Sequence, residues 1–290
     1  MATSPPNDSE RTKAAKPTGQ FRDFVQMHPI AVGGAFFIVV LILASLFAPL
    51  PYDPELPNPE VGISPPSADH WFGTDITGAD VFSRTIAAAW VDLSLALAGT
   101  LLSLAIGVPL GLATSVKRRW SDNLVRGMDA FQAFPLLILA LVLVSLSGNK
   151  LYMVVVAIAL INIPRYMRLI RSEVLSLREA RFMEATTAMG VPLPRTLRKH
   201  VLPNVMGIIT AQTTLTMANA IVVIATLSFL GIGVAPPTPS WGSMIRSGSS
   251  NMISGEWWIA LFPGLFVLIC VWILNQLSDA ISDFNPRPTR

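Results

Sequence analysis

The 290-residue chain is 52% apolar and only 13% charged, whereas soluble domains usually carry about 25% charged residues. Long stretches have no charge at all, and Lys and Arg gather in short segments between them, which indicates lipid as the solvent for most of the chain. The net charge of +3 is explained by basic loops on one side of a membrane, so we do not expect nucleic acid as a partner.

Residues 1–28 predict a disordered cytoplasmic tail, because their first 20 or so residues are rich in Pro, Ser, Thr and Lys and offer little to bury. The apolar run that begins near Pro29 is long enough to cross a bilayer. We therefore interpret residues 29–50 as the first transmembrane helix, an anchor and not a cleaved leader.

Six apolar stretches approach the roughly 20 residues that cross the ~30 Å hydrocarbon layer. The fourth contains Arg165 and Arg168, which we expect to reach the membrane interface. A tight hairpin at residues 147–150 should join the third and the fourth. The expected spans are residues 29–50, 93–115, 130–146, 151–168, 205–234 and 257–277.

Between the first two spans lies an outside segment, residues 51–92, in which residues 81–90 predict a short helix on the membrane surface. Residues 93–284 form the expected transmembrane core, and residues 285–290 the C-terminus. Of the 21 Lys and Arg residues, 18 fall in the tail, in the even-numbered loops and at the C-terminus. Because cytoplasmic loops are enriched in these residues, both termini are expected in the cytoplasm.

Residues 171–203 form a polar cytoplasmic insertion between the fourth and fifth spans. A helix should stop at Gly190, with Pro192 blocking its continuation and Pro194 suited to the first turn of a second helix. Apolar residues along this helix pair have no lipid to cover them. Such a surface indicates a protein partner, although an amphipathic helix resting on lipid headgroups would have a similar pattern.

The same segment resembles the EAA loop of bacterial ABC import permeases. Glu184-Ala185-Thr186, then Gly190, then Leu202-Pro203 match its spacing, with Thr186 in place of the second Ala and His200 in place of an Ile. The resemblance implies that this loop docks on a cytoplasmic ATPase. The residues that it assigns to coupling are Glu184, Ala185, Gly190, Arg195, His200, Leu202 and Pro203.

Further motifs are similar to the C-type permeases of dipeptide, oligopeptide and nickel importers. They are His70-Trp71-Phe72-Gly73-Thr74-Asp75, Asp80-Val81-Phe82-Ser83-Arg84, and the stretches at 227–231 and 236–242. Where that branch usually has Gly, Arg and Ser, this chain has Ala88, Trp90 and Asp92. The resemblance implies an outside face toward a binding protein, made by Phe72, Asp75, Asp80, Arg84 and Trp241.

This resemblance implies an all-helical, multi-pass protein of the bacterial cytoplasmic (inner) membrane, with the type I ABC importer permease fold and six spans. Its implied partners are a second, homologous permease in a heterodimer, two cytoplasmic ABC ATPase domains, an extracytoplasmic solute-binding protein and membrane lipid. Peptides are the implied substrates. ATP and Mg would be used by the ATPase partners, and no cofactor would be bound by this chain.

Other functions remain open at this point. The same assembly could import nickel, haem or another small solute, because related permeases share these motifs. A stand-alone secondary transporter is the main rival, yet proton-coupled carriers usually need ionisable groups at membrane depth, and Asp92 and Asp129 lie near span ends. The sequence has no phosphate loop ending in Gly-Lys-Ser or Gly-Lys-Thr, so the chain itself should not hydrolyse ATP.

Neither a catalytic site nor a metal site is expected. His28, His70 and His200 are too scattered to share a metal, and the single cysteine, Cys270, fits a packing role. Four polar residues within spans are candidates for a solute path: Gln132, Asn162, Gln212 and Asn219. Each could instead hydrogen-bond across helices and hold the bundle together, which is the favoured interpretation.

Overall fold

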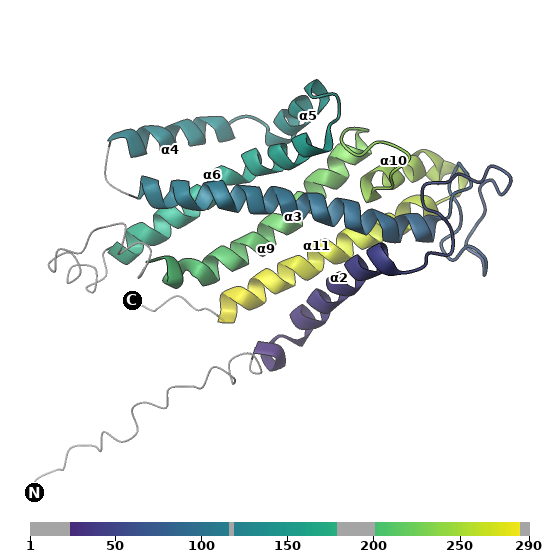
Figure 1. Ribbon diagram of the computed structural model, residues 1–290, viewed down its shortest axis with the longest axis horizontal. Coiled ribbons are helices and arrows are strands. Elements are labelled where there is room, and N and C mark those ends of the chain that lie inside the picture. The colour runs from purple at the N-terminus through teal and green to yellow at the C-terminus, as the bar shows by residue number, and fades with distance from the viewer. Residues whose placement is uncertain (1–23, 116–118, 179–200, 285–290) are drawn as a thin grey trace, which may run out of the picture.

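The computed structural model describes residues 24–115, 119–178 and 201–284, and these are helical with no β-strand. Five of its helices, α2, α3, α6, α9 and α11, are long and apolar enough to cross a membrane, and the bent pair α4 and α5 makes six if it counts as one span (Figure 1). The elements are α2 (Pro29–Phe47), α3 (Val81–Thr114), α4 (Arg119–Gln132), α5 (Leu136–Leu146), α6 (Leu151–Arg178), α9 (Leu202–Phe229), α10 (Trp241–Asn251), η3 (Met252–Ser254) and α11 (Trp258–Phe284).

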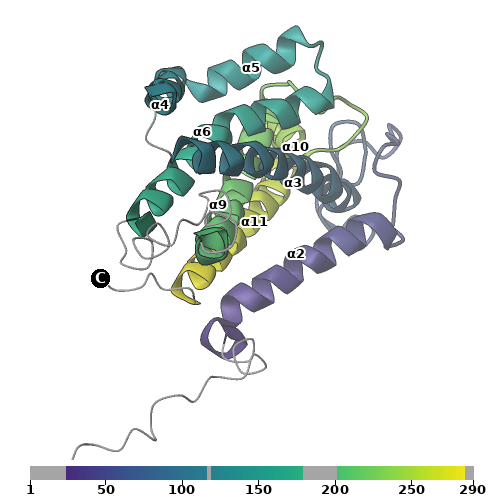
Figure 2. The same cartoon turned by 60° about the vertical axis from the view of Figure 1, so that its left-hand side comes forward.

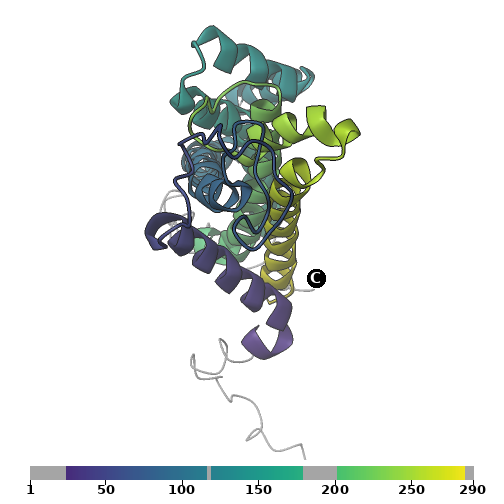
Figure 3. The same ribbon diagram turned by 90° about the vertical axis from the view of Figure 1, so that its right-hand side faces the viewer.

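The long helices lie side by side, with α9 packed against α3, α6, α10 and α11. Helices α4 and α5 cover one side of the bundle and α2 the opposite side (Figure 2). One end of the bundle carries residues 48–80 and α10; we call it the cap end, and Figure 3 views the molecule from there. The opposite end, where α9 begins and α6 and α11 end, we call the basal end.

Helix α3 runs unbroken for 34 residues, about 51 Å at 1.5 Å per residue, which exceeds the ~30 Å hydrocarbon layer. The expected separate surface helix at 81–90 is therefore wrong: these residues are the first turns of α3. Asp92, at the end of the expected outside segment, lies within α3. Its carboxylate is buried and accepts a hydrogen bond from Trp241 N at 2.8 Å, so α10 satisfies it and the helix continues past it.

The third expected span, residues 130–146, is also wrong as a single helix. It is divided into α4 and α5, which meet at 83° across residues 133–135. Pro135 has no N–H to donate and disfavours helical geometry at the preceding residue, so the helix ends before it. Helix α4 also begins earlier than expected, at Arg119.

Helix α3 and helix α6 approach each other closely because small residues recur along their contact. Gly99, Ser103, Gly107 and Gly111 are spaced by four residues on α3, and all four are buried. A Cβ added at any of the three glycines would lie within 2.7 Å of α6 side-chain atoms. Small residues at this spacing let helix backbones pack tightly in a membrane.

The structure also tests the expected hairpin, the end of the expected tail and the ends of two predicted spans. The tight hairpin at 147–150 is confirmed, with Gly148 and Asn149 at positive φ. The expected disordered tail is corrected at its end, because residues 24–27 are helical and the Phe24 ring packs edge-on against Phe284. Helices α6 and α11 extend at the basal end beyond the predicted spans, to Arg178 and Phe284.

Candidate functional site

The cap end is organised by Asp80, which caps the N-terminus of α3. One carboxylate oxygen accepts hydrogen bonds from Ser83 N and Ser83 Oγ at 2.7 and 2.8 Å, as expected for an N-cap residue. The other lies 2.9 Å from His70 Nδ1, and the His70 ring stacks on Tyr52. Asp80 thus ties two parts of the segment 48–80 to the start of the longest helix.

Asp75 closes a neighbouring turn. Its Oδ1 accepts hydrogen bonds from Thr77 N, Thr77 Oγ1 and Ala79 N, and its Oδ2 lies 3.5 Å from Arg84 Nε. Arg84 also donates to Pro54 O at 2.9 Å. The acidic and basic residues of this motif therefore hold the cap segment on α3.

Aromatic residues join the cap to α10 and α11. Trp241 is fully buried and donates through its indole N–H to Thr85 O at 2.9 Å, while its backbone N–H reaches Asp92. Phe72 stacks on Phe262 of α11 with ring centroids 4.0 Å apart. The cap is thus a packed layer that links α3, α10 and α11.

At membrane level, α9 leaves one side uncovered by the rest of the chain. Gln212, Leu215, Asn219, Val222 and Thr226 share this side because they recur at intervals of three or four residues. Leu215, Asn219 and Val222 are exposed, and Gln212 and Thr226 are partly so. The uncovered side of α9 is therefore mixed in character, with polar groups well inside a membrane-spanning helix.

The four path candidates do not converge. Asn162 is buried, donating to Ile158 O at 2.9 Å and accepting from Arg165 Nη1 at 3.1 Å. Gln132 is half-buried where α4 ends, whereas Gln212 and Asn219 lie on the uncovered side of α9. Only the α9 pair shares one exposed face, so Asn162 is placed as a structural residue of α6.

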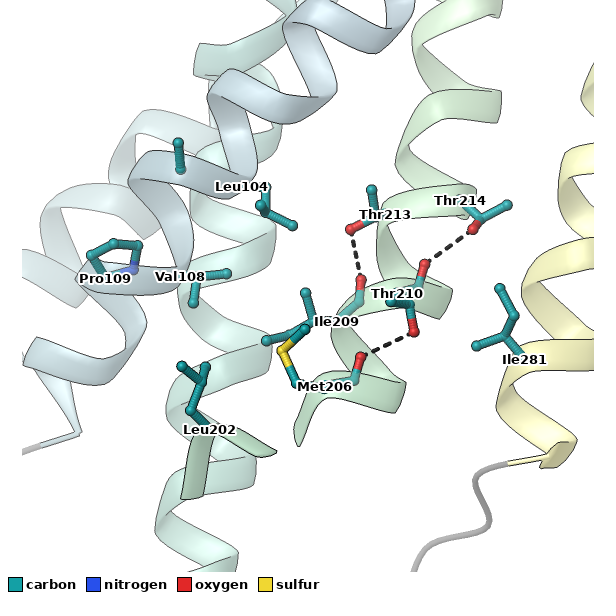
Figure 4. Close-up of a pocket in the computed structure, with 11 residues that line it drawn as sticks. Leu104, Val108, Pro109, Leu202, Met206, Ile209, Thr210, Thr213, Thr214 and Ile281 are labelled. Atoms are coloured by element: carbon teal, nitrogen blue, oxygen red, sulfur yellow. Dashed lines mark hydrogen bonds between the residues drawn. The ribbon is translucent and has the colours of Figure 1, made fainter. Parts of the chain in front are cut away.

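A cavity of about 680 Å³ opens toward the basal end between α3, α9 and α11 (Figure 4). Three threonines contribute to its wall, and the side-chain hydroxyl of each donates to a carbonyl of its own helix. The wall thus presents mainly methyl and methylene groups. The labelled lining residues are Leu104, Val108, Pro109, Leu202, Met206, Ile209, Thr210, Thr213, Thr214 and Ile281.

Comparison with known proteins decides the family. The model of the binding-protein-dependent transport system inner membrane component matches residues 103–289. The chain belongs to this family.

Two curated relatives support the assignment over most of the permease. The dipeptide transport system permease protein DppC of Alkalihalophilus pseudofirmus is 36% identical over 283 residues, covering 97% of this chain and 92% of the relative. A Brucella suis protein named as a peptide permease is 40% identical over 262 residues, covering 87% of each chain.

A solved structure supports the fold. A chain from inward-facing conformations of the MetNI methionine ABC transporter matches with a TM-score of 0.60 and 17% identity, covering 71% of this permease and 98% of that chain. The expected type I ABC importer permease fold is confirmed. The protein is a multi-pass inner-membrane permease subunit of an ABC importer, a class that works with ATPase and binding-protein partners.

The geometry corrects one expectation about the outside motif. Asp75, Asp80 and Trp241 are buried inside the cap of the permease, and Arg84 and Phe72 are largely enclosed, so these five residues build the cap and do not face a docked protein. Their hydrogen-bond and ring partners explain why. The exposed large side chains of the cap end include Trp71, within the first motif, and Leu56, Ile76, Trp90, Ile253 and Trp257, outside the motifs.

Most residues assigned to ATPase coupling lie outside the described residues: Glu184, Ala185, Gly190, Arg195 and His200. Leu202 and Pro203 are described and form the first turn of α9. Proline fits there because an N–H in the first turn has no intrahelical acceptor. Leu202 also lines the basal cavity, so the end of the coupling segment adjoins the wall between α3 and α9.

Proposed function

We propose that this permease is the C-type half of a heterodimeric importer for dipeptides or oligopeptides. The observation that carries the proposal is the uncovered side of α9, where Asn219 is exposed at membrane level. Its side-chain N–H donates to Leu215 O at 3.0 Å, which satisfies only part of the hydrogen-bonding capacity of an amide.

Lipid is a poor neighbour for such a face, because polar groups in hydrocarbon without partners are unfavourable. A second, homologous permease set against α9 would enclose Gln212, Asn219 and Thr226 in a protein-lined path. The path would be polar without strong charge, which suits a conduit that receives its solute from a separate binding protein. A path of this kind between two subunits also explains why one subunit alone is not expected to transport.

Peptide is proposed as the substrate because the relative at 36% identity over 97% of the chain is named a dipeptide permease. Nickel, haem or another small solute is the competing cargo. The cap end would face the binding protein, and the basal end, with both termini, would face the cytoplasm. There one of the two ATPase domains of the assembly would dock on residues 171–203 of this chain. The ATPase domains would use ATP and Mg, with no cofactor held by this chain.

The coupling role has a direct test in Gly190→Pro. Proline at that turn should disrupt the docking loop, so transport is expected to fail while the protein stays in the membrane. Normal transport by this variant would contradict ATPase docking at this loop.

The assembly is tested by mild-detergent affinity purification of this permease from its native membrane, with mass spectrometry of partners and an ATPase assay. A second permease and ATPase subunits in the eluate, together with ATP hydrolysis, are the expected result. Proteoliposomes supplied with the binding protein should then take up labelled dipeptides in preference to nickel or haem. An ATPase-free preparation in several detergents would favour the stand-alone carrier.

A further inference from the structure

Arg171, near the basal end of α6, contacts two other helices at once. Its Nη1 donates to the carbonyl oxygen of Thr114, in the last turn of α3, and to Ser121 Oγ at 2.6 Å, at the start of α4. Its Nη2 lies 2.9 Å from Asp122 Oδ1, also on α4. We call Arg171, Thr114, Ser121 and Asp122 the basal hub.

The basal hub is enclosed at its centre. Thr114 and Ser121 are fully buried, and Ser121 Oγ donates to Thr114 O at 2.6 Å, so the same carbonyl accepts from both Ser121 and Arg171. The positive charge of Arg171 also lies at the C-terminal end of α3, where the helix dipole is negative, and this arrangement is favourable. A planar guanidinium can meet several acceptors in fixed directions, which a lysine ammonium on a flexible stem cannot do in the same way.

Helix α4 depends on this hub. From Trp120 to Gln132, Ser121 is the only buried residue, and α4 has far fewer neighbours on α3 and α6 than those two have on each other. A second ion pair between α4 and α6, Arg168 with Asp129 at 3.3 Å, is about half exposed on both sides. Such exposed pairs contribute little.

Helices α3 and α6 are joined more firmly, because the close contacts of Gly99, Gly107 and Gly111 hold them together. Helix α6 continues without a break to Arg178, and residues 179–200, which contain the loop assigned to ATPase docking, follow in the chain. A displacement that enters through α6 thus reaches α3 by packing and α4 through the hub.

We propose that Arg171 is a positioning residue for energy coupling, which makes the start of α4 follow the α3–α6 pair when the ATPases drive α6. The inference rests on the proposed function, since it needs ATPase docking at residues 179–200. Without Arg171, α6 and α3 still move, but the broken span α4–α5 no longer moves with them. ATP hydrolysis then continues while solute import falls.

The test uses the complete importer, purified with its partners and reconstituted with the binding protein. Arg171→Ala should lower solute uptake at least about tenfold, the scale of one lost charge-assisted hydrogen bond, while ATP hydrolysis stays within about twofold of wild type. Solute uptake by Arg171→Lys should lie between that of wild type and that of Arg171→Ala. Arg168→Ala, which removes the exposed ion pair, is the matched control and should keep the wild-type ratio of ATP hydrolysed to solute imported.

A second variant covers the case in which Arg171→Ala fails to fold. Ser121→Ala with Asp122→Ala removes the α4 side of the hub and leaves Arg171 on Thr114 O, so it should give the same uncoupling. Spin labels at Asn123 on α4 and Leu101 on α3 report the movement itself. The distance between the labels should stay the same when ATP is added to wild type, because α4 follows α3, and it should shift or broaden in the double variant.

The outcomes separate this inference from the function on which it rests. An importer that lacks ATPase partners refutes the proposed function. A normal, ATP-driven importer in which Arg171→Ala and the double variant keep the wild-type ratio refutes the role of Arg171. Loss of the partner subunits from the double variant would make the hub a determinant of assembly and would also overturn the positioning role, as would wild-type coupling in Arg171→Lys.

Discussion

Alanine at Gly107 or Gly111 tests whether α3 and α6 form one rigid body. A Cβ at position 107 would lie 2.5 Å from Tyr166 Cβ and 3.0 Å from Ile163 O, and a Cβ at position 111 would lie 2.6 Å from Ile170 Cβ. These atoms are backbone or are fixed directly to it. Side-chain rotation therefore cannot relieve the contact, and the two helices must separate.

The expected effect follows from the distances. Restoring an ordinary contact of 3.4–4 Å separates the helices by about 1 Å. Overpacking costs about 1–3 kcal/mol, whereas alanine recovers roughly 1 kcal/mol of helix propensity relative to glycine. The net loss is about 0–2 kcal/mol for each substitution, which lowers the unfolding midpoint by up to roughly 6 °C.

Cys270 provides the assay, because it is the only cysteine in the chain and is fully buried. A thiol-reactive fluorophore will label it only as the subunit opens on heating, and in-gel fluorescence assigns the signal to this subunit within the complex. Gly33→Ala and Gly264→Ala are matched controls, since a Cβ at either position meets nothing within 4 Å. Equal midpoints for all four variants would refute the close-packing argument.

Three further predictions concern the cap end and the path candidates. Gly78→Ala should expose residues 51–80 to protease, because the φ of Gly78 is +75° and the new Cβ would lie 1.8 Å from a backbone oxygen. Gly62→Ala, at φ +61° in open space, is the control and should destabilise the cap by about 1–3 kcal/mol less. Asp92→Ala should leave the backbone N–H of Trp241 unsatisfied and destabilise the protein by about 1–3 kcal/mol, measured as a lower midpoint of Cys270 labelling. Asp92→Asn keeps an acceptor and should destabilise the protein less. Equal midpoints for the two variants and wild type would argue against this hydrogen bond. Asn219→Leu should reduce uptake with an unchanged midpoint, and Asn162→Leu should lower the midpoint; the reverse pattern would exchange their roles.

Local composition predicted much of the architecture. Apolar length and the absence of charge located the long helices, because a bilayer imposes both conditions on the part of a helix that crosses it. They did not locate every end, since α3 begins at Val81 and α6 continues to Arg178, outside the predicted spans. The tight hairpin at residues 147–150 was predicted from the short interval between two apolar stretches.

Other features depended on partners distant in the sequence. Asp92 predicted the edge of a span, but the N–H of Trp241, 149 residues away, satisfies it and lets α3 continue. The motif at residues 70–84 predicted an outward face, but its charged side chains bond to one another inside the cap. The sequence identifies the residues of such a motif, but it does not determine whether their side chains point into the fold or away from it.

By itself, then, the sequence determined the membrane location, the approximate spans and the family-like loop at Glu184, since each is set by local chemistry or local spacing. The tertiary structure decided which polar residues are enclosed. Asn162 and Asn219 are the same amino acid in apolar helices of similar length, yet one is buried within α6 and its neighbours and the other lies on an uncovered face of α9. Burial is a property of the packed helices around a residue, and the sequence next to it does not specify that environment.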